Sequence, residues 1–75
     1  MSNFPSVKPK ELLKILEKIG FHIHHQTGSH IILKNHDTRV VLPFHNKDLK
    51  LGTLMNILRQ ANLSKKDFLN LWEEN

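Results

Sequence analysis

The stretch of sequence that decides the fold is FHIHHQTGSHIILKNHDTRVVL, residues 21–42. Within it, Phe21, Ile23 and His25 alternate with His22 and His24, which is the period of a β-strand, and two further β runs follow, the last one rich in β-branched residues. The three runs are residues 21–25, 30–34 and 38–42. Turn-forming residues separate the runs at 26–29 and 35–37, and Pro43 ends the last one. Because both connections are short, the stretch predicts three antiparallel strands that pair in sequence order.

An amphipathic helix is predicted before this stretch, over residues 8–19. Its apolar residues follow helical spacing and line one face, namely Leu12, Ile15, Leu16 and Ile19. Pro9 suits the first helical turn, where its missing N–H costs nothing, and Gly20 suits a left-handed end. A face of this kind is suited to packing against a sheet.

Two further helices are predicted in the last third of the chain. The first covers residues 51–61, and its apolar face comprises Leu51, Leu54, Met55, Leu58 and Ala61. Asn62 is suited to a left-handed cap after it. Ser64 and Asp67 resemble a capping box that starts a short final helix. We expect Trp72 in that helix to pack against the core or a partner.

The predicted order of elements indicates an α+β fold. It is α-β-β-β-α, with a three-stranded antiparallel sheet and a short extra C-terminal helix, which is the order of the double-stranded-RNA-binding domain. A chain of 75 residues has room for one core, so residues 1–75 are expected to form a single domain. The chain has no cysteine, so its stability has to come from packing or from a partner.

The charge of the chain points to an anionic partner. Eleven Lys and Arg residues against seven Asp and Glu residues give a formal net charge of +4, which favours a polyanion such as RNA, or an acidic protein. The N-terminal residues lack the apolar segment of a secretory signal, and no apolar run approaches the roughly 20 residues of a membrane span. We therefore expect a cytoplasmic protein with no membrane attachment.

The segment Gly28-Ser29-His30 is the candidate catalytic site. Gly28 is free to adopt a positive φ angle and lets a phosphate backbone approach, while Ser29 helps to shape the turn. His30 is held at the start of a strand yet reaches solvent, and an imidazole exchanges protons near neutral pH. A general base and a nearby cation suffice for the 2′-hydroxyl of RNA to attack the adjacent phosphate, without a cofactor. From spacing alone, an ordinary exposed strand histidine is the more frequent meaning of this tripeptide.

Basic residues around His30 are candidate RNA contacts: Lys34, Arg39, His45, Lys47 and Lys50. The last two precede a helix N-terminus, which itself favours an anion. Each lysine taken singly is equally consistent with solvated surface, and they favour RNA binding only as a group. His45 either contacts a phosphate, donates a proton or has a structural role. Phe44 is left open between stacking on a base and packing.

All six histidines of the chain fall between positions 22 and 45. Strict alternation along the first strand places His22 and His24 on one face, and Phe21, Ile23 and His25 on the other. Ligands at such spacing occur in some metal sites, but the chain has no cysteine and no His-x3-His pair. We therefore predict no metal site and interpret these histidines as solvent-facing strand residues.

Several motifs occur in a fixed order along the chain. They are Gly20-Phe21, QTGSH at 26–30, LPFH at 42–45, KDLKLGTL at 47–54 and ILRQANLS at 57–64. In order and spacing they resemble the HicA toxin family, over about residues 10–68. The resemblance implies a HicA-like toxin domain with the double-stranded-RNA-binding-like fold. It also implies a type II toxin that acts as an mRNA interferase, with the catalytic histidine at His30.

The resemblance further implies a HicB-type antitoxin that covers the active face, with the toxin monomeric alone and hetero-oligomeric in the complex. Two positions depart from the family pattern. Asn62 stands where glycine is usual, which is conservative for a left-handed cap. His25 stands where arginine is common, and an imidazole is not a permanent cation. Two alternatives stay open. One is a non-catalytic RNA-binding module of the same fold, and the other is a protein whose only role is to form part of a complex through its open sheet face.

Overall fold

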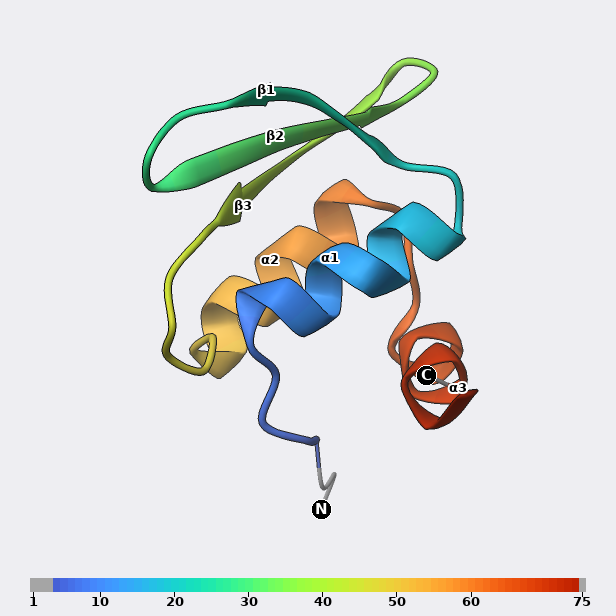
Figure 1. Cartoon of the computed structure of the whole chain (residues 1–75). Coiled ribbons are helices and arrows are strands. Elements are labelled where there is room, and N and C mark those ends of the chain that lie inside the picture. The colour runs from blue at the N-terminus through green and yellow to red at the C-terminus, as the bar shows by residue number, and fades with distance from the viewer. Residues whose placement is uncertain (1–3, 75) are drawn as a thin grey trace.

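The computed structural model describes residues 4–74 (Figure 1). The elements, in order, are α1 (Pro9–Lys18), β1 (His22–Gln26), β2 (His30–Asn35), β3 (Thr38–Pro43), α2 (Leu51–Gln60) and α3 (Lys65–Glu74). The three strands form one antiparallel sheet in the order β1-β2-β3. The predicted α+β fold, with its C-terminal helix, is confirmed. No helix among the described residues is long and apolar enough to cross a lipid bilayer.

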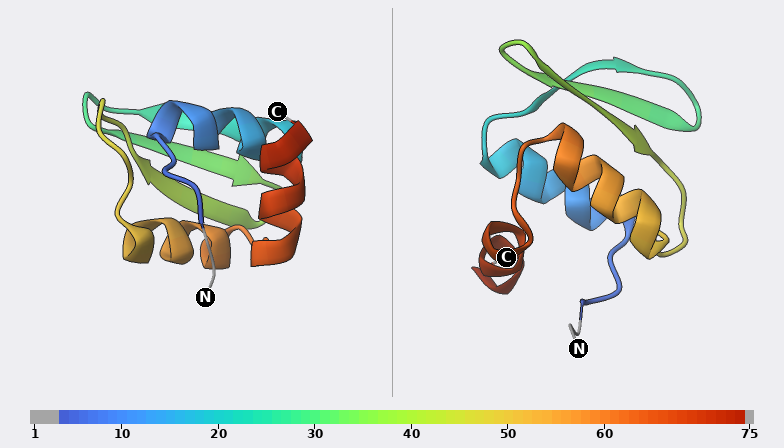
Figure 2. Two further views of the ribbon diagram at one scale, coloured as in Figure 1. Left: turned by 90° about the horizontal axis from the view of Figure 1, so that it is seen from below. Right: turned by 180° about the vertical axis from the view of Figure 1, so that it is seen from behind.

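The sheet forms one layer, and α1 and α2 form a second layer against it (Figure 1). These two helices run side by side in the same direction, and α3 crosses their C-terminal ends almost at a right angle (Figure 2). We call the helix-covered side of the sheet the inner face and the opposite side the outer face. None of the three helices covers the outer face, so it is open to solvent.

The core lies between the inner face and the helices. Alternate residues of β2 and β3 supply the sheet side and are at most 1% exposed: Ile31, Leu33, Val40 and Leu42. The helices supply Leu12, Ile15 and Leu16 from α1, and Leu54, Ile57 and Leu58 from α2. Burial in both predicted strands therefore follows the period of two of a strand with one covered face.

The edge strand β1 departs from strict alternation. All five of its residues are exposed, and its pairing with β2 shifts between Ile23 and His25. His24 is thus the extra residue of a β-bulge. Ile23 lies opposite Leu33 on the inner face, whereas His25 lies opposite Ile32 on the outer face. The expectation that His25 shares a face with Ile23 is wrong, because the bulge shifts the register by one residue.

The predicted ends of the helices are confirmed. Gly20 follows α1 with a φ of 106°, and Asn62 follows α2 with a φ of 57°. A Cβ at Gly20 would lie 3.1 Å from the side-chain amide of Asn35, which would have to move by a few tenths of an ångström to accept it. The Ser64 hydroxyl accepts a hydrogen bond from Asp67 N at 3.1 Å and caps α3.

Aromatic packing attaches α3 to the rest of the molecule. Phe68 is completely buried, and its ring stacks on Phe4 with 5.7 Å between the ring centroids. Trp72 lies one turn further along α3, with its ring centroid 6.1 Å from that of Phe68. Trp72 therefore packs against the core, as expected.

Candidate functional site

Hydrogen bonds from Thr27 hold the backbone of His30 at the start of β2. Thr27 N donates to His30 O at 2.9 Å, and the Thr27 hydroxyl donates to the same carbonyl at 3.3 Å. The hydroxyl also accepts a hydrogen bond from His30 N at 3.2 Å. Sequence reasoning missed this role of Thr27, although a hydroxyl residue in a tight turn is a known signal for such bonds.

The same turn is also tied to the chain after β3. His30 lies opposite Pro43 in the ladder between β2 and β3. Pro43 has no N–H to donate, and the next residue, Phe44, donates its N–H to Ser29 O at 2.8 Å. Hydrogen bonds to the turn before β2 and to the chain after β3 therefore both hold the backbone at the start of β2.

The imidazole of His30 is exposed, and its Nδ1 atom lies 3.0 Å from Ser29 Oγ. A hydroxyl group donates to an unprotonated imidazole nitrogen and accepts from a protonated one. Ser29 therefore orients the ring through Nδ1 in either tautomer, and Nε2 is the nitrogen that remains for a ligand. This contact gives Ser29 a role beyond the shape of the turn.

Gly28 leaves open space beside His30. A Cβ built at this position would meet no atom within 4 Å. Its φ is not positive, since the described residues with positive φ are Gly20, His36 and Asn62. The turn thus does not use the backbone freedom expected of Gly28, and the approach of a phosphate backbone to this open space stays a prediction.

Two of the predicted basic residues lie far from His30. Lys34 and Arg39 face each other across β2 and β3, and Lys34 is four residues from His30, or about 13 Å at strand spacing. His25 is nearer, because its position opposite Ile32 makes it a diagonal neighbour of His30, at roughly 7–8 Å in such a sheet. His25 therefore shares the outer face with His30.

The other three predicted basic residues line one cavity of about 320 Å³ at the N-terminus of α2. They are His45, Lys47 and Lys50. The cavity also includes Pro43, the cross-strand partner of His30. The first turn of α2 carries no acidic residue, and Asp48, which lines the cavity, is ion-paired with Lys8 at 3.0 Å. The cavity is thus suited to a phosphate group.

One hydrogen bond determines the tautomer of the neutral His45 ring. Lys47 N donates to His45 Nδ1 at 3.1 Å. Because an N–H donor requires an unprotonated acceptor, the neutral ring carries its proton on Nε2. That N–H can donate to a phosphate oxygen in the same cavity.

The histidines as a set do not converge on one point. Among residues 4–74, no three His, Asp or Glu side chains come close enough together to hold a metal ion. His22 and His25 lie on β1, His36 lies in the turn between β2 and β3, and His45 follows β3.

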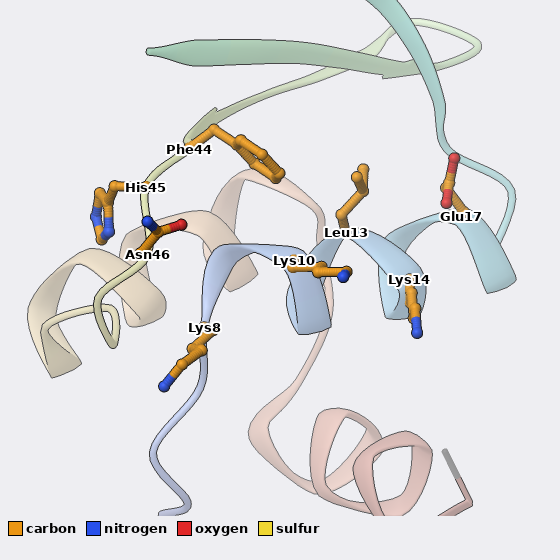
Figure 3. A pocket seen from close by; sticks show the side chains of 8 residues that line it. All are labelled: Lys8, Lys10, Leu13, Lys14, Glu17, Phe44, His45 and Asn46. Atoms are coloured by element: carbon orange, nitrogen blue, oxygen red, sulfur yellow. The ribbon is translucent and has the colours of Figure 1, made fainter.

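A larger cavity of about 630 Å³ lies between α1 and the segment after β3 (Figure 3). Its lining residues are Lys8, Lys10, Leu13, Lys14, Glu17, Phe44, His45 and Asn46. Sequence reasoning missed this cavity, whose two sides are some thirty residues apart along the chain.

Comparison with known families identifies the chain. No individual curated protein matches it. The family model of the HicA toxin of bacterial toxin–antitoxin systems matches residues 9–63. This span includes α1, the whole sheet with His30, and α2, whereas α3 lies outside it. Since the match covers most of the 75 residues, the chain belongs to the HicA toxin family.

Proposed function

We propose that this toxin is a metal-independent endoribonuclease that cleaves messenger RNA, with His30 as its single catalytic histidine. The observation that carries the proposal is the exposed imidazole at the start of β2, with Nδ1 3.0 Å from Ser29 Oγ. Its backbone is hydrogen-bonded to Thr27, and the neighbouring Ser29 carbonyl is bonded to Phe44. A ring that is both accessible and held in one orientation is suited to proton transfer.

The proposed reaction is attack of the ribose 2′ oxygen on the adjacent phosphorus. His30 Nε2 accepts the 2′-hydroxyl proton while the O2′–P bond forms and the P–O5′ bond breaks. The resulting imidazolium returns the proton to the leaving 5′ oxygen, directly or through water, so no co-reactant is consumed. The products are a 2′,3′-cyclic phosphate and a 5′-hydroxyl end.

Basic residues supply the other half of the proposed chemistry. Lys47, Lys50 and His45 line a cavity beside Pro43, and in the proposal they stabilise charge on the phosphate that is attacked. Lys34 and Arg39 bind the RNA backbone at the far end of the outer face. The open space at Gly28 admits the backbone between these contacts.

We further propose that a HicB-type antitoxin silences the toxin by covering the outer face, and that the toxin alone is a monomer. Support comes from the composition of this face, where half-buried Ile32 and Val41 lie opposite each other at its centre. Exposed histidines and Arg39 surround them. An apolar centre with a polar rim is typical of protein interfaces. A cytoplasmic site of action belongs to the same proposal, since that is where bacterial mRNA is translated.

The experiment compares the purified wild type with the His30→Ala variant, both in the presence of a metal chelator. We expect the variant to cleave RNA about 10²- to 10⁴-fold more slowly, the usual contribution of a positioned acid–base group. Its thermal unfolding should match that of the wild type, because His30 is exposed. The RNA fragments are expected to carry 5′-hydroxyl ends, and induction of the variant in cells should not arrest growth.

Two results would reject the proposal. Equal cleavage by a folded His30→Ala variant would show that another group performs the chemistry. Salt-dependent RNA binding by the wild type without new RNA ends would instead identify a non-catalytic RNA-binding module. Co-expression with the product of an adjacent HicB-like reading frame, where present, tests the partner through co-purification and recovery of growth.

A further inference from the structure

Apart from His45, the residues that line the cavity between α1 and the segment after β3 have no part in the proposed chemistry. Its volume of about 630 Å³ lies in the range of small-molecule sites. Figure 3 shows the Phe44 ring extending from its segment toward Leu13 of α1, while Lys10 and Lys14 line the cavity from α1 and the Lys14 side chain extends away from the ring. The cavity therefore combines an aromatic ring, an aliphatic wall and two cations.

The two cations are available to a ligand. Lys8 is held by Asp48 at 3.0 Å, but Lys10 and Lys14 form no ion pair with any of residues 4–74. Both lysines are exposed. Glu17 is the one carboxylate among the described lining residues, and it points away from Lys14 (Figure 3). The rim of the cavity consequently carries an excess of positive charge that suits an anionic ligand.

The cavity is directly connected to the turn that carries His30. Phe44, whose ring lines the cavity, donates its N–H to Ser29 O at 2.8 Å. His45 lines both this cavity and the smaller one with Lys47 and Lys50. The two cavities therefore lie on either side of one short segment, residues 44–46, which adjoins the candidate catalytic turn.

We propose that the cavity beside α1 is a subsite for one nucleotide of single-stranded RNA, next to the nucleotide whose phosphate is cleaved. The base lies against the Phe44 ring, and Lys10 and Lys14 hold the attached phosphate. The inference rests on the proposed ribonuclease function and names the substrate class of that site. A nucleotide fits because it joins a flat base to an anion, and base–aromatic stacking tolerates any sequence. A paired base in a duplex is not free to enter such a cavity.

The test measures binding of a fluorescein-labelled single-stranded RNA of about 12 nucleotides in the His30→Ala background, which prevents cleavage. Phe44→Leu keeps apolar packing but removes the aromatic face, so we expect the Kd to rise about tenfold. The Lys10→Ala/Lys14→Ala double variant should lower the slope of log affinity against log salt by about 0.7, because the two lysines hold one phosphate. Thermal unfolding of each variant checks that it is folded.

The matched control is Lys65→Ala/Lys66→Ala, which removes two equally exposed lysines from the start of α3. We expect this variant to change the salt slope by less than half as much. Equal effects of the two double variants would show general charge attraction and overturn the subsite. An unchanged Kd in Phe44→Leu would overturn it as well.

The inference and the proposed function fail in different ways. If the wild type cleaves RNA and the cavity variants bind it normally, the subsite is rejected while the ribonuclease stands. If the cavity variants lose RNA binding but the wild type makes no new RNA ends, the subsite is supported and the ribonuclease is rejected. Cavity variants that bind and cleave RNA normally but escape the antitoxin would assign the cavity to a protein partner and overturn the subsite.

Discussion

The two faces of β2 serve different purposes although their residues alternate along one strand. Ile31 and Leu33 on the inner face are 1% and 0% exposed. His30 on the outer face is exposed, and Ile32 and Lys34 are only half-buried. Neighbours in sequence thus belong either to the core that holds the fold or to the surface that we propose meets RNA. Substitutions on the inner face of β2 should therefore change stability, and substitutions one residue away on the outer face should change activity.

The roles of holding the fold and of forming the site are less clearly separated at Thr27 and Phe44, the turn residues on either side of the candidate site. Thr27 fixes the backbone of His30 and yet has no part in the core. Phe44 packs against the core, bonds Ser29 through its N–H and also lines the larger cavity. Substitutions at these turn residues are therefore expected to affect activity through position, with smaller effects on stability.

The largest expected effect is a loss of stability when a side chain on the inner face is shortened. Leu33→Ala removes a completely buried side chain and should lower the free energy of unfolding by about 2–5 kcal/mol. A domain of this size has roughly 4–11 kcal/mol in total, so the variant approaches the limit of folding. Urea denaturation followed by circular dichroism measures the change.

The matched control for Leu33→Ala is Ile32→Ala, one residue away on the outer face. It should cost about 1 kcal/mol or less, because Ile32 is only half-buried. Equal losses in the two variants would break the comparison and indicate that the outer face is also part of the core.

The periodicity of the sequence predicted most of the fold. Residues 30–34 and 38–42, predicted as β runs, lie in β2 and β3, although their unbroken apolar stretches did not show which side is buried. Gly20 and Asn62 marked the ends of helices because few other residues tolerate positive φ. The sequence also led to the candidate tripeptide, and the family match now supports the toxin assignment.

The parts that sequence reasoning missed depend on pairing and on tertiary approach. The bulge at His24 left no mark in the sequence, because the alternation at 21–25 is apolar only at Phe21 and Ile23, and no residue of β1 is buried to fix its register. Lys10, Lys14 and Phe44 line the same cavity beside α1, and nothing in their spacing along the chain predicts this. The spread of basic residues over two ends of the sheet likewise needed the strand register.

A smaller effect, on kcat, is expected from a substitution at Ser29, next to His30 at the start of β2. Ser29→Ala removes the hydroxyl that lies 3.0 Å from His30 Nδ1. Loss of one such hydrogen bond, about 0.5–1.5 kcal/mol, should lower kcat about 2- to 12-fold and leave KM and the unfolding free energy nearly unchanged. Steady-state cleavage of a short RNA measures both constants. Ser29→Thr keeps the hydroxyl and should restore kcat, whereas a similar loss in Ser29→Thr would mean that the hydrogen bond does not orient the ring.

The smallest expected effects are on RNA binding, and they compare basic residues at the two ends of the outer face. Lys34→Ala, about 13 Å from His30 along β2, should weaken RNA binding slightly, with a fall of about 0.7 in the salt slope for one lost phosphate contact. Its kcat should not change, because the residue does not reach the attacked phosphate. Lys47→Ala, in the cavity beside Pro43, should instead lower kcat as well as the slope.

The ratio of kcat between Lys34→Ala and Lys47→Ala therefore decides whether the outer face has one functional end or two. A lower kcat in Lys47→Ala alone assigns the chemistry to the end where β2 begins and β3 finishes. Equal values of kcat would mean that Lys47 holds the RNA without stabilising the attacked phosphate. In that case the stabilising charge comes from Lys50 or His45 in the same cavity, or from His25, the diagonal neighbour of His30 on the outer face. Single alanine variants at these three positions would identify the group by a lower kcat.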